Sequence, residues 1–185
     1  VYKRPEAVAG AVDYLSPHVY YYDSDPVRHT YAYSFALEYC LSLGKPVVLE
    51  EYGFPTSLYT EESHARFVSL VAYAALAVGA SGAWVWCGFD FEREDDEPYL
   101  WEPHELSFGV FRSDGTPKPA AEALREFAEF LEWFEGQGFE RAPPDCAILV
   151  PSYFYRDYPF YGDDRECMAA GMLATYILAK AAGLR

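Results

Sequence analysis

The stretch KPVVLEEYG, residues Lys45–Gly53, decides how this chain folds. It follows a Gly-Lys-Pro break and opens on three apolar residues, Val47–Leu49, two of which are β-branched. A short apolar run of this kind is typical of a strand buried on both faces, as in a parallel sheet. The run ends on two adjacent carboxylates, Glu50 and Glu51. Because side chains alternate along a strand, we expect these carboxylates to point in opposite directions, so that only one faces a given side of the sheet.

Strands and helices alternate on either side of this stretch, through residue 136. Such an order predicts an α/β fold made of parallel βα units with right-handed crossovers. Three such units are too few to close a barrel, and three parallel strands alone leave sheet edges exposed. The predicted elements are a strand over Val12–Tyr22, a helix over Val27–Leu43, a strand over Val47–Glu51, a helix over Glu61–Val78, a strand over Ala83–Cys87 and a helix over Pro119–Glu135.

A further strand and helix follow, and they predict a second domain. Ala147–Val150, AILV, has the pattern of a buried strand, and Arg165–Ala182 has the pattern of a helix. We therefore divide the chain into residues 1–138 and residues 139–185. The second part is interpreted as the first βα unit of a truncated, flavodoxin-like α/β domain. It is also a candidate surface for homo-oligomer formation.

Composition limits the kinds of partner. Of the 185 residues, 51% are hydrophobic and 18% aromatic, as expected of a globular chain. Aromatic rings provide flat platforms in sugar sites, and they also fill cores. The formal net charge of −15 argues against nucleic acid and against an anionic membrane surface, because both attract basic proteins. No charge-free run of 18 apolar residues predicts a membrane span.

The four cysteines are widely scattered, and none belongs to a CxxC or Cys/His cluster. We therefore expect no metal site and no cofactor. A disulfide framework is not expected either, which favours a reducing compartment and so a cytoplasmic location over secretion.

Several motifs in residues 12–136 carry a resemblance to a known family. They are Glu51-Tyr52-Gly53, His18-Val19-Tyr20, Trp86, Phe108-Gly109-Val110 and the run DGTPKP at 114–119. Together they resemble strands 6–8, the last three βα units, of the TIM (β/α)8 barrel in clan A retaining glycoside hydrolases, of the cellulase, β-mannanase and β-galactosidase type. By the same kind of comparison, residues 139–185 resemble the start of an amidotransferase-like accessory domain.

The resemblance implies a role for each matched side chain. Glu51 would be the catalytic nucleophile, and the Tyr20 hydroxyl would hydrogen-bond its carboxylate and keep it ionised. His18 would line the subsite of the sugar that is cleaved, and the Trp86 ring would form the floor of that subsite. The residues alone leave plainer alternatives open, namely an ordinary loop histidine at 18 and a core tryptophan at 84 or 86.

The long acidic loop Gly88–Phe108 exceeds the usual length of a connection, so we expect it to be functional or mobile. Its residues Asp90 and Glu105 are candidates for contacts with substrate hydroxyls. A solvated acidic loop is an equally good interpretation of both.

The resemblance implies hydrolysis of β-linked oligo- or polysaccharides with retention, by double displacement. That chemistry needs two carboxylates roughly 5–5.5 Å apart. The family's acid/base Glu follows an Asn at the end of the fourth strand, and no strand here is followed by Asn-Glu. We therefore expect a fragment that lacks the N-terminal half of the barrel and is inactive alone.

Two other hypotheses remain open. The first is a non-catalytic carbohydrate-binding barrel of the same fold. The second is an unrelated α/β protein in which the strand end at 50–51 is structural. The second hypothesis predicts no short contact between Glu51 and Tyr20.

Overall fold

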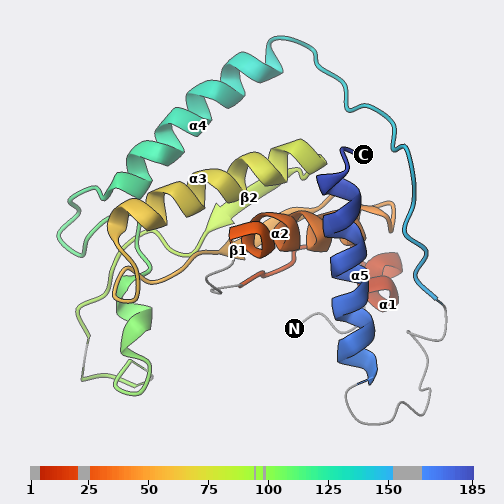
Figure 1. Cartoon of the computed structure of the whole chain (residues 1–185). Helices are drawn as coiled ribbons and strands as arrows, with labels where there is room; N and C mark the ends of the chain where they lie inside the picture. Colours follow the sequence, from red (N-terminus) through yellow and green to blue (C-terminus); the bar gives the residue numbers. More distant parts are fainter. Residues whose placement is uncertain (1–4, 21–25, 94, 98, 152–163) are drawn as a thin grey trace.

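The computed structural model describes residues 5–20, 26–93, 95–97, 99–151 and 164–185 (Figure 1). Its helices and strands follow the alternation that the sequence predicts. In chain order they are α1 Pro5–Val8, the 3-10 turn η1 Ala9–Ala11, α2 Pro26–Leu41, β1 Val48–Tyr52, α3 Glu61–Val78, β2 Gly82–Val85, the 3-10 turn η2 Pro103–Ser107, α4 Pro119–Glu135 and α5 Asp164–Ala181.

The sheet is small and parallel. β1 pairs with β2, with Val48 opposite Gly82. On the other edge of β1, the chain before α2 makes two parallel bridges, Leu15 with Val47 and His18 with Glu51. The strand predicted over residues 12–22 is therefore only partly formed. Pro17 lacks a backbone N–H, so it cannot donate to this ladder. Residues 21 and 22 lie outside the described residues.

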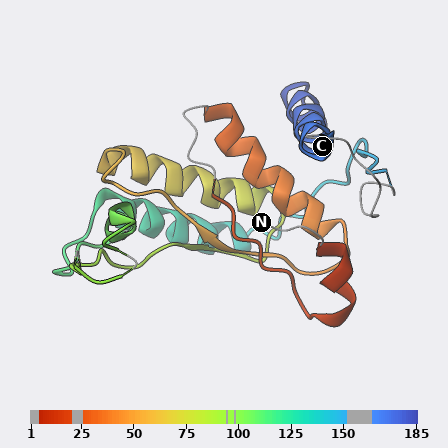
Figure 2. The same cartoon turned by 90° about the horizontal axis from the view of Figure 1, so that it is seen from below.

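One face of the sheet packs against α2 and α3, which Figures 1 and 2 show side by side. The β1 side chains Leu49 and Tyr52 are fully buried on this face. The Tyr52 ring meets Tyr33 of α2 and Phe67 of α3 at centroid distances of 6.4 Å. Burial of the Tyr52 phenol raises its pKa. The side chains of β1 that alternate with these ones face the other side, where the candidate site lies.

Local signals fix the helix that follows β1. Thr60 caps α3, because its side chain accepts a hydrogen bond from the Ser63 backbone N–H at 3.2 Å. Gly79 ends α3 at φ 82°, in the left-handed region. The bounds predicted for α3 and α4 are confirmed.

The predicted strand over Ala147–Val150 is not formed. These residues have no strand or bridge pairing, and Leu149 is 88% exposed. A strand requires a partner for its backbone groups, and no described segment pairs with this one. The helix that follows it in sequence is formed as α5, and it packs on α2 through Phe35 and Tyr176, whose ring centroids are 5.5 Å apart.

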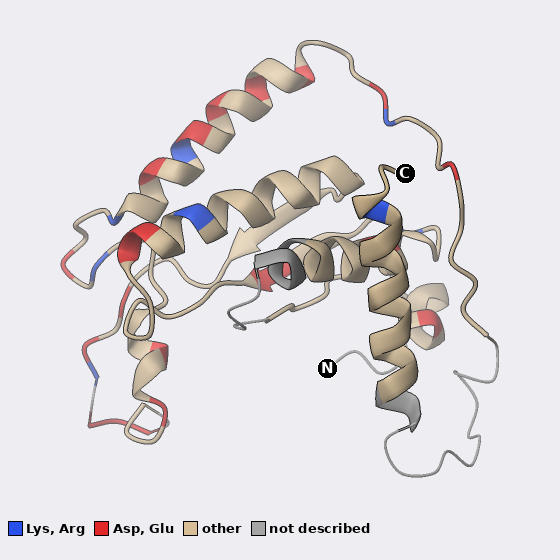
Figure 3. Cartoon of the chain, in the orientation of Figure 1, with Lys and Arg blue, Asp and Glu red and all other residues tan. Residues whose placement is uncertain are grey.

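Charge is distributed unevenly over these elements. Acidic residues lie along α4 and in the loop after β2, whereas α2 and α3 carry few charges (Figure 3). The uncharged surfaces of α2 and α3 provide the core. Within the described ranges, no helix combines the length and the apolarity needed to cross a bilayer.

Candidate active site

A β-bulge brings both adjacent glutamates to one side of the sheet. Leu49 lies opposite Ala83, but Tyr52 lies opposite Val85, so β1 contains one residue more than β2 over this interval. The extra residue interrupts the alternation of side chains at Glu50 and Glu51. The expectation that these carboxylates point in opposite directions is therefore wrong. Both carboxylates reach the same histidine.

That histidine is His18, at the end of the neighbouring segment. Its Nε2 lies 3.1 Å from Oε2 of Glu50, and its Nδ1 lies 3.1 Å from Oε2 of Glu51. The His18 side chain is 43% exposed, and its ring lies between the two carboxylates. It is therefore not a histidine of a free loop.

Tyr20 hydrogen-bonds the same oxygen of Glu51. Its hydroxyl donates to Oε2 at 2.8 Å, which is the contact expected from the sequence. The Tyr20 ring is set edge-on against Phe108, at a centroid distance of 6.3 Å. Within the described residues, both contacts to Glu51 fall on Oε2, so Oε1 remains open.

Glu50 is held in its ionised form by neighbouring donors. The Ser16 side-chain hydrogen bond lowers the pKa of Glu50 most, followed by the hydrogen bond from His18. Such bonds favour the charged carboxylate. Two carboxylates therefore share one site with an imidazole and two hydroxyls, from Ser16 and Tyr20.

Trp86, the residue that follows β2, lies directly beside Gly53. The Trp86 backbone N–H donates to the Tyr52 carbonyl at 2.8 Å. A Cβ added at Gly53 would lie 2.2 Å from the Trp86 carbonyl oxygen, so only glycine fits this position. The glycine of the Glu-Tyr-Gly motif therefore permits the close approach of the two strand ends.

Both tryptophans of this segment are accessible in this chain, so neither belongs to the core that the described residues form. Trp84 is 56% exposed and Trp86 is 37% exposed. Because Trp86 follows the carboxyl end of β2, whereas Trp84 lies within the strand, Trp86 is the better candidate for a sugar platform, as the sequence predicts. Its role there remains a prediction.

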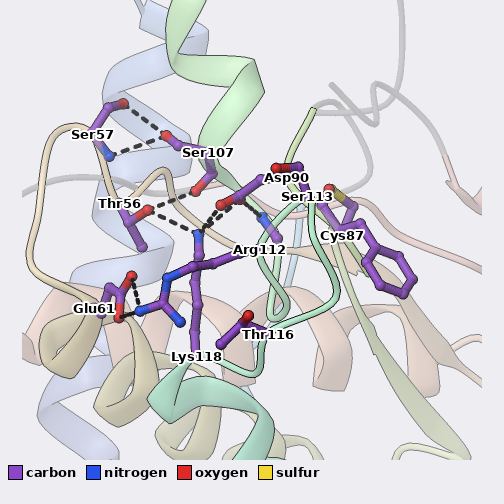
Figure 4. A network of polar contacts seen from close by, with 12 residues as sticks. Thr56, Ser57, Glu61, Cys87, Asp90, Ser107, Arg112, Ser113, Thr116 and Lys118 are labelled. Atoms are coloured by element: carbon purple, nitrogen blue, oxygen red, sulfur yellow. Dashed lines mark hydrogen bonds and ion pairs between the residues drawn. The ribbon is translucent and has the colours of Figure 1, made fainter. Parts of the chain in front are cut away.

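Asp90 has a structural partner. Lys118, at the start of α4, is almost fully buried, and its Nζ lies 2.7 Å from both carboxylate oxygens of Asp90 (Figure 4). Asp90 also accepts from the Gly109 N–H at 2.8 Å, and Lys118 reaches the Thr56 hydroxyl at 3.1 Å. These contacts support a structural role for Asp90 rather than the substrate contact considered above. Lys118 lies within the DGTPKP run, but nothing in that run marks it as the partner of Asp90.

Further hydrogen bonds connect the loops around the pair of Asp90 and Lys118. Arg112 donates to both carboxylate oxygens of Glu61 at 2.8 and 2.6 Å. The Thr56 hydroxyl donates to the Ser107 carbonyl at 3.0 Å, and the Ser57 N–H to the Ser107 hydroxyl at 3.1 Å. The loops that follow β1 and β2 are therefore joined to each other beside the strand ends (Figure 4).

Glu105 lies on η2, next to His104, with 34% of its side chain exposed. The His104 ring lies 6.4 Å from Phe108, which in turn contacts Tyr20. This chain of rings places η2 near the site without a described contact between Glu105 and Glu51. A substrate contact by Glu105 remains a prediction.

Other titratable groups nearby are kept neutral by burial. His64 is fully buried, its ring nitrogens have no hydrogen-bond partner among the described residues, and desolvation lowers its pKa to about 4. Desolvation also raises the pKa of the Cys40 and Cys87 thiols to about 11, so neither is a ready nucleophile. Across the described ranges, no cluster of three His, Cys, Asp or Glu side chains is arranged to hold a metal ion.

No family model and no curated protein matches the chain. Solved structures do. A GH5_18 variant from Streptomyces cattleya in complex with Manb1-4GlcNAc has a TM-score of 0.72 at 22% identity, over 97% of this chain and 44% of that one. The exo-beta-1,4-mannosidase Op5Man5 from Opitutaceae bacterium strain TAV5 has a TM-score of 0.70 at 21% identity, over 94% and 32%. A Bifidobacterium dentium beta-glucuronidase complexed with coumarin-3-O-glucuronide has a TM-score of 0.52 at 22% identity, over 71% and 22%.

These similarities concern the backbone. The chain has the fold of part of a glycoside hydrolase barrel. It spans less than half the length of each of these solved structures. The match over 97% of the chain extends past residue 138, so it includes part of the second predicted domain. The division at 138 and the amidotransferase-like resemblance remain predictions.

Proposed function

We propose that this chain forms strands 6–8 of a (β/α)8-barrel retaining β-glycoside hydrolase, with Glu51 as the nucleophile. One observation carries the proposal. The carboxylate of Glu51 stands at the carboxyl ends of parallel strands, and both Tyr20 and His18 hold it by the same oxygen. Barrel enzymes place their active sites at this end of the strands. A carboxylate anchored through one oxygen presents the other for attack.

The chemistry that we propose is a double displacement. Oε1 of Glu51 attacks the anomeric carbon, and the bond from that carbon to the leaving oxygen breaks. The leaving oxygen takes a proton from the acid/base carboxyl, which the first half of the barrel supplies. Water then attacks the same carbon, gives its proton to the acid/base carboxylate and releases Glu51 from its ester. No metal or cofactor takes part in these steps.

We propose β-mannosyl compounds as the first substrates to test. Support comes from two structural neighbours, one named an exo-beta-1,4-mannosidase and one in complex with Manb1-4GlcNAc. In this proposal the Trp86 ring forms the floor of the sugar subsite and His18 lines it.

The experiment uses the longer protein in which the barrel is complete. It should hydrolyse an aryl β-mannoside, and Glu51→Gln should lower kcat at least about 1,000-fold, since the amide cannot attack. An activated 2-fluoro mannoside should add one sugar mass to the peptide that contains residue 51. Labelling of a different residue, or full activity of Glu51→Gln, would contradict the assignment. The 185-residue chain alone is expected to be inactive.

The same experiment separates the enzyme from a non-catalytic sugar-binding barrel. Such a barrel would bind the mannoside without turnover and without labelling. The decisive residue is the acid/base glutamate of the N-terminal half, because binding alone does not need it.

A further inference from the structure

We propose that Glu50 is a positioning residue, which holds the His18 ring so that Nδ1 faces the nucleophile. This inference rests on the proposed function of Glu51. Glu50 does not touch the reacting atoms in this proposal. It acts through the imidazole, whose two nitrogens face the two carboxylates at 3.1 Å each.

The bulge in β1 is what makes this role available. In a regular strand, Glu50 and Glu51 would lie on opposite faces, and one ring could not reach both. The extra residue in β1 brings them to one side, at the carboxyl end of the strand. Bulges are frequent next to active sites, where they redirect a side chain.

The contact with Glu50 matters because there is space beside the ring. Ser16, His18 and Glu50 line one cavity of about 250 Å³, next to the segment that precedes α2. The χ2 torsion of a histidine is broad, so an unanchored ring can turn into such a space. The bond from Nε2 to Glu50 fixes the ring plane. The Ser16 hydroxyl, which also bonds Glu50, fixes the carboxylate in turn.

The position of the ring matters because Nδ1 of His18 and the Tyr20 hydroxyl both contact the same oxygen of Glu51. If His18 turns away, the Tyr20 hydroxyl alone holds Oε2, and the carboxylate can rotate about its own axis. Misplacement of an attacking group by about 1 Å costs up to about 100-fold in rate. Because Tyr20 still holds the carboxylate, we expect a smaller loss for Glu50→Ala, about ten-fold.

The kinetic test uses the complete barrel and hydrolysis of an aryl β-mannoside. Glu50→Ala should lower kcat about ten-fold with little change in KM, because attack rather than binding is impaired. Glu50→Gln keeps a hydrogen-bonding side chain of the same length and should recover most of the loss. In a His18→Ala background, Glu50→Ala should have no further effect, because the positioning acts through the ring.

Glu126→Ala is the matched control, since it removes an exposed carboxylate of α4 and should leave kcat unchanged. A wild-type kcat for Glu50→Ala would overturn the inference, as would a full ten-fold further loss in the His18→Ala background. Glu51→Gln separates the two proposals. Full activity of Glu51→Gln overturns the proposed function itself, whereas its inactivity beside a fully active Glu50→Ala overturns only the positioning role.

A second measurement needs no activity. In the 185-residue chain, the ring ¹⁵N signals of His18 report its hydrogen bonds. Glu50→Ala should shift the Nε2 signal and broaden both ring signals, and Glu126→Ala should change neither. Unchanged ring signals in Glu50→Ala would show that the carboxylate does not hold the ring.

Discussion

The buried pair of Lys118 and Asp90 gives a sharp prediction for stability. The lysine side chain is 2% exposed and the aspartate side chain 18% exposed, so both charges have largely left water. Lys118→Met keeps most of the buried volume and removes the cation. Asp90 then retains the Gly109 N–H as a donor but loses its counter-charge. Breaking a buried pair by removing one partner costs about 3–5 kcal/mol. Because Asp90 keeps some solvent, we expect about 3 kcal/mol.

The assay is urea unfolding of the 185-residue chain, followed by tryptophan fluorescence. With a slope of about 2 kcal/mol per molar urea, the loss lowers the midpoint by about 1.5 M. Arg125→Met is the matched control, because it removes a cation of the same helix whose partners, Glu122 and Glu129, are exposed. Exposed pairs contribute little, so its midpoint should stay at the wild-type value.

The double variant Lys118→Met/Asp90→Leu tests the mechanism. Replacing a buried ion pair by apolar side chains is often neutral, so the double variant should recover most of the lost stability. The reasoning fails if Lys118→Met behaves like Arg125→Met. It also fails if the double variant is no more stable than Lys118→Met, because the cost would then not come from an unpaired carboxylate.

Three further predictions concern the same region. Gly53→Ala should cost at least about 2 kcal/mol in urea unfolding, because its Cβ would meet the Trp86 carbonyl, whereas Gly88→Ala, with open space around it, should be close to neutral. Burial lowers the pKa of His64 to about 4, so between pH 7 and pH 5 only the unfolded state takes up a proton at this residue. The free energy of unfolding should therefore fall by about 2 kcal/mol over this range. His64→Leu should remove this part of the pH dependence. Trp86→Ala should raise KM about ten-fold in the complete barrel, with exposed Trp133→Ala of α4 as the control.

Local signals in the sequence predicted the helices well. The Thr60 cap and the glycine at 79 gave the bounds of α3, because capping depends on residues within one turn. The contact between Tyr20 and Glu51 was also predicted, although from the family resemblance rather than from spacing. The bulge in β1 was not predicted. A register shift depends on the neighbouring strand, so it cannot be inferred from the alternation of side chains along one strand.

The ion pair of Asp90 with Lys118 was not predicted, for a similar reason. Asp90 belongs to a run of acidic residues and has no sequence feature that distinguishes it as buried. Its partner Lys118 lies 28 residues further along, at the start of a helix whose face gave no sign of a buried charge. Ion pairs across loops are therefore visible only once the loops are placed. The predicted strand at 147–150 failed for a related reason, because an apolar run forms a strand only beside a partner.

The arrangement around residue 51 argues against a merely structural strand end. Two acidic side chains held together on one side of a sheet are unfavourable, and a strand end has no need of them. Here a bulge creates that proximity, and Ser16, His18 and Tyr20 supply the donors that stabilise it. The structural alternative also predicted no short contact between Tyr20 and Glu51, and the 2.8 Å bond contradicts it. Sequences accept such local conflicts mainly where function requires them. The conflict at 50–51 therefore marks this strand end as the place to look for chemistry.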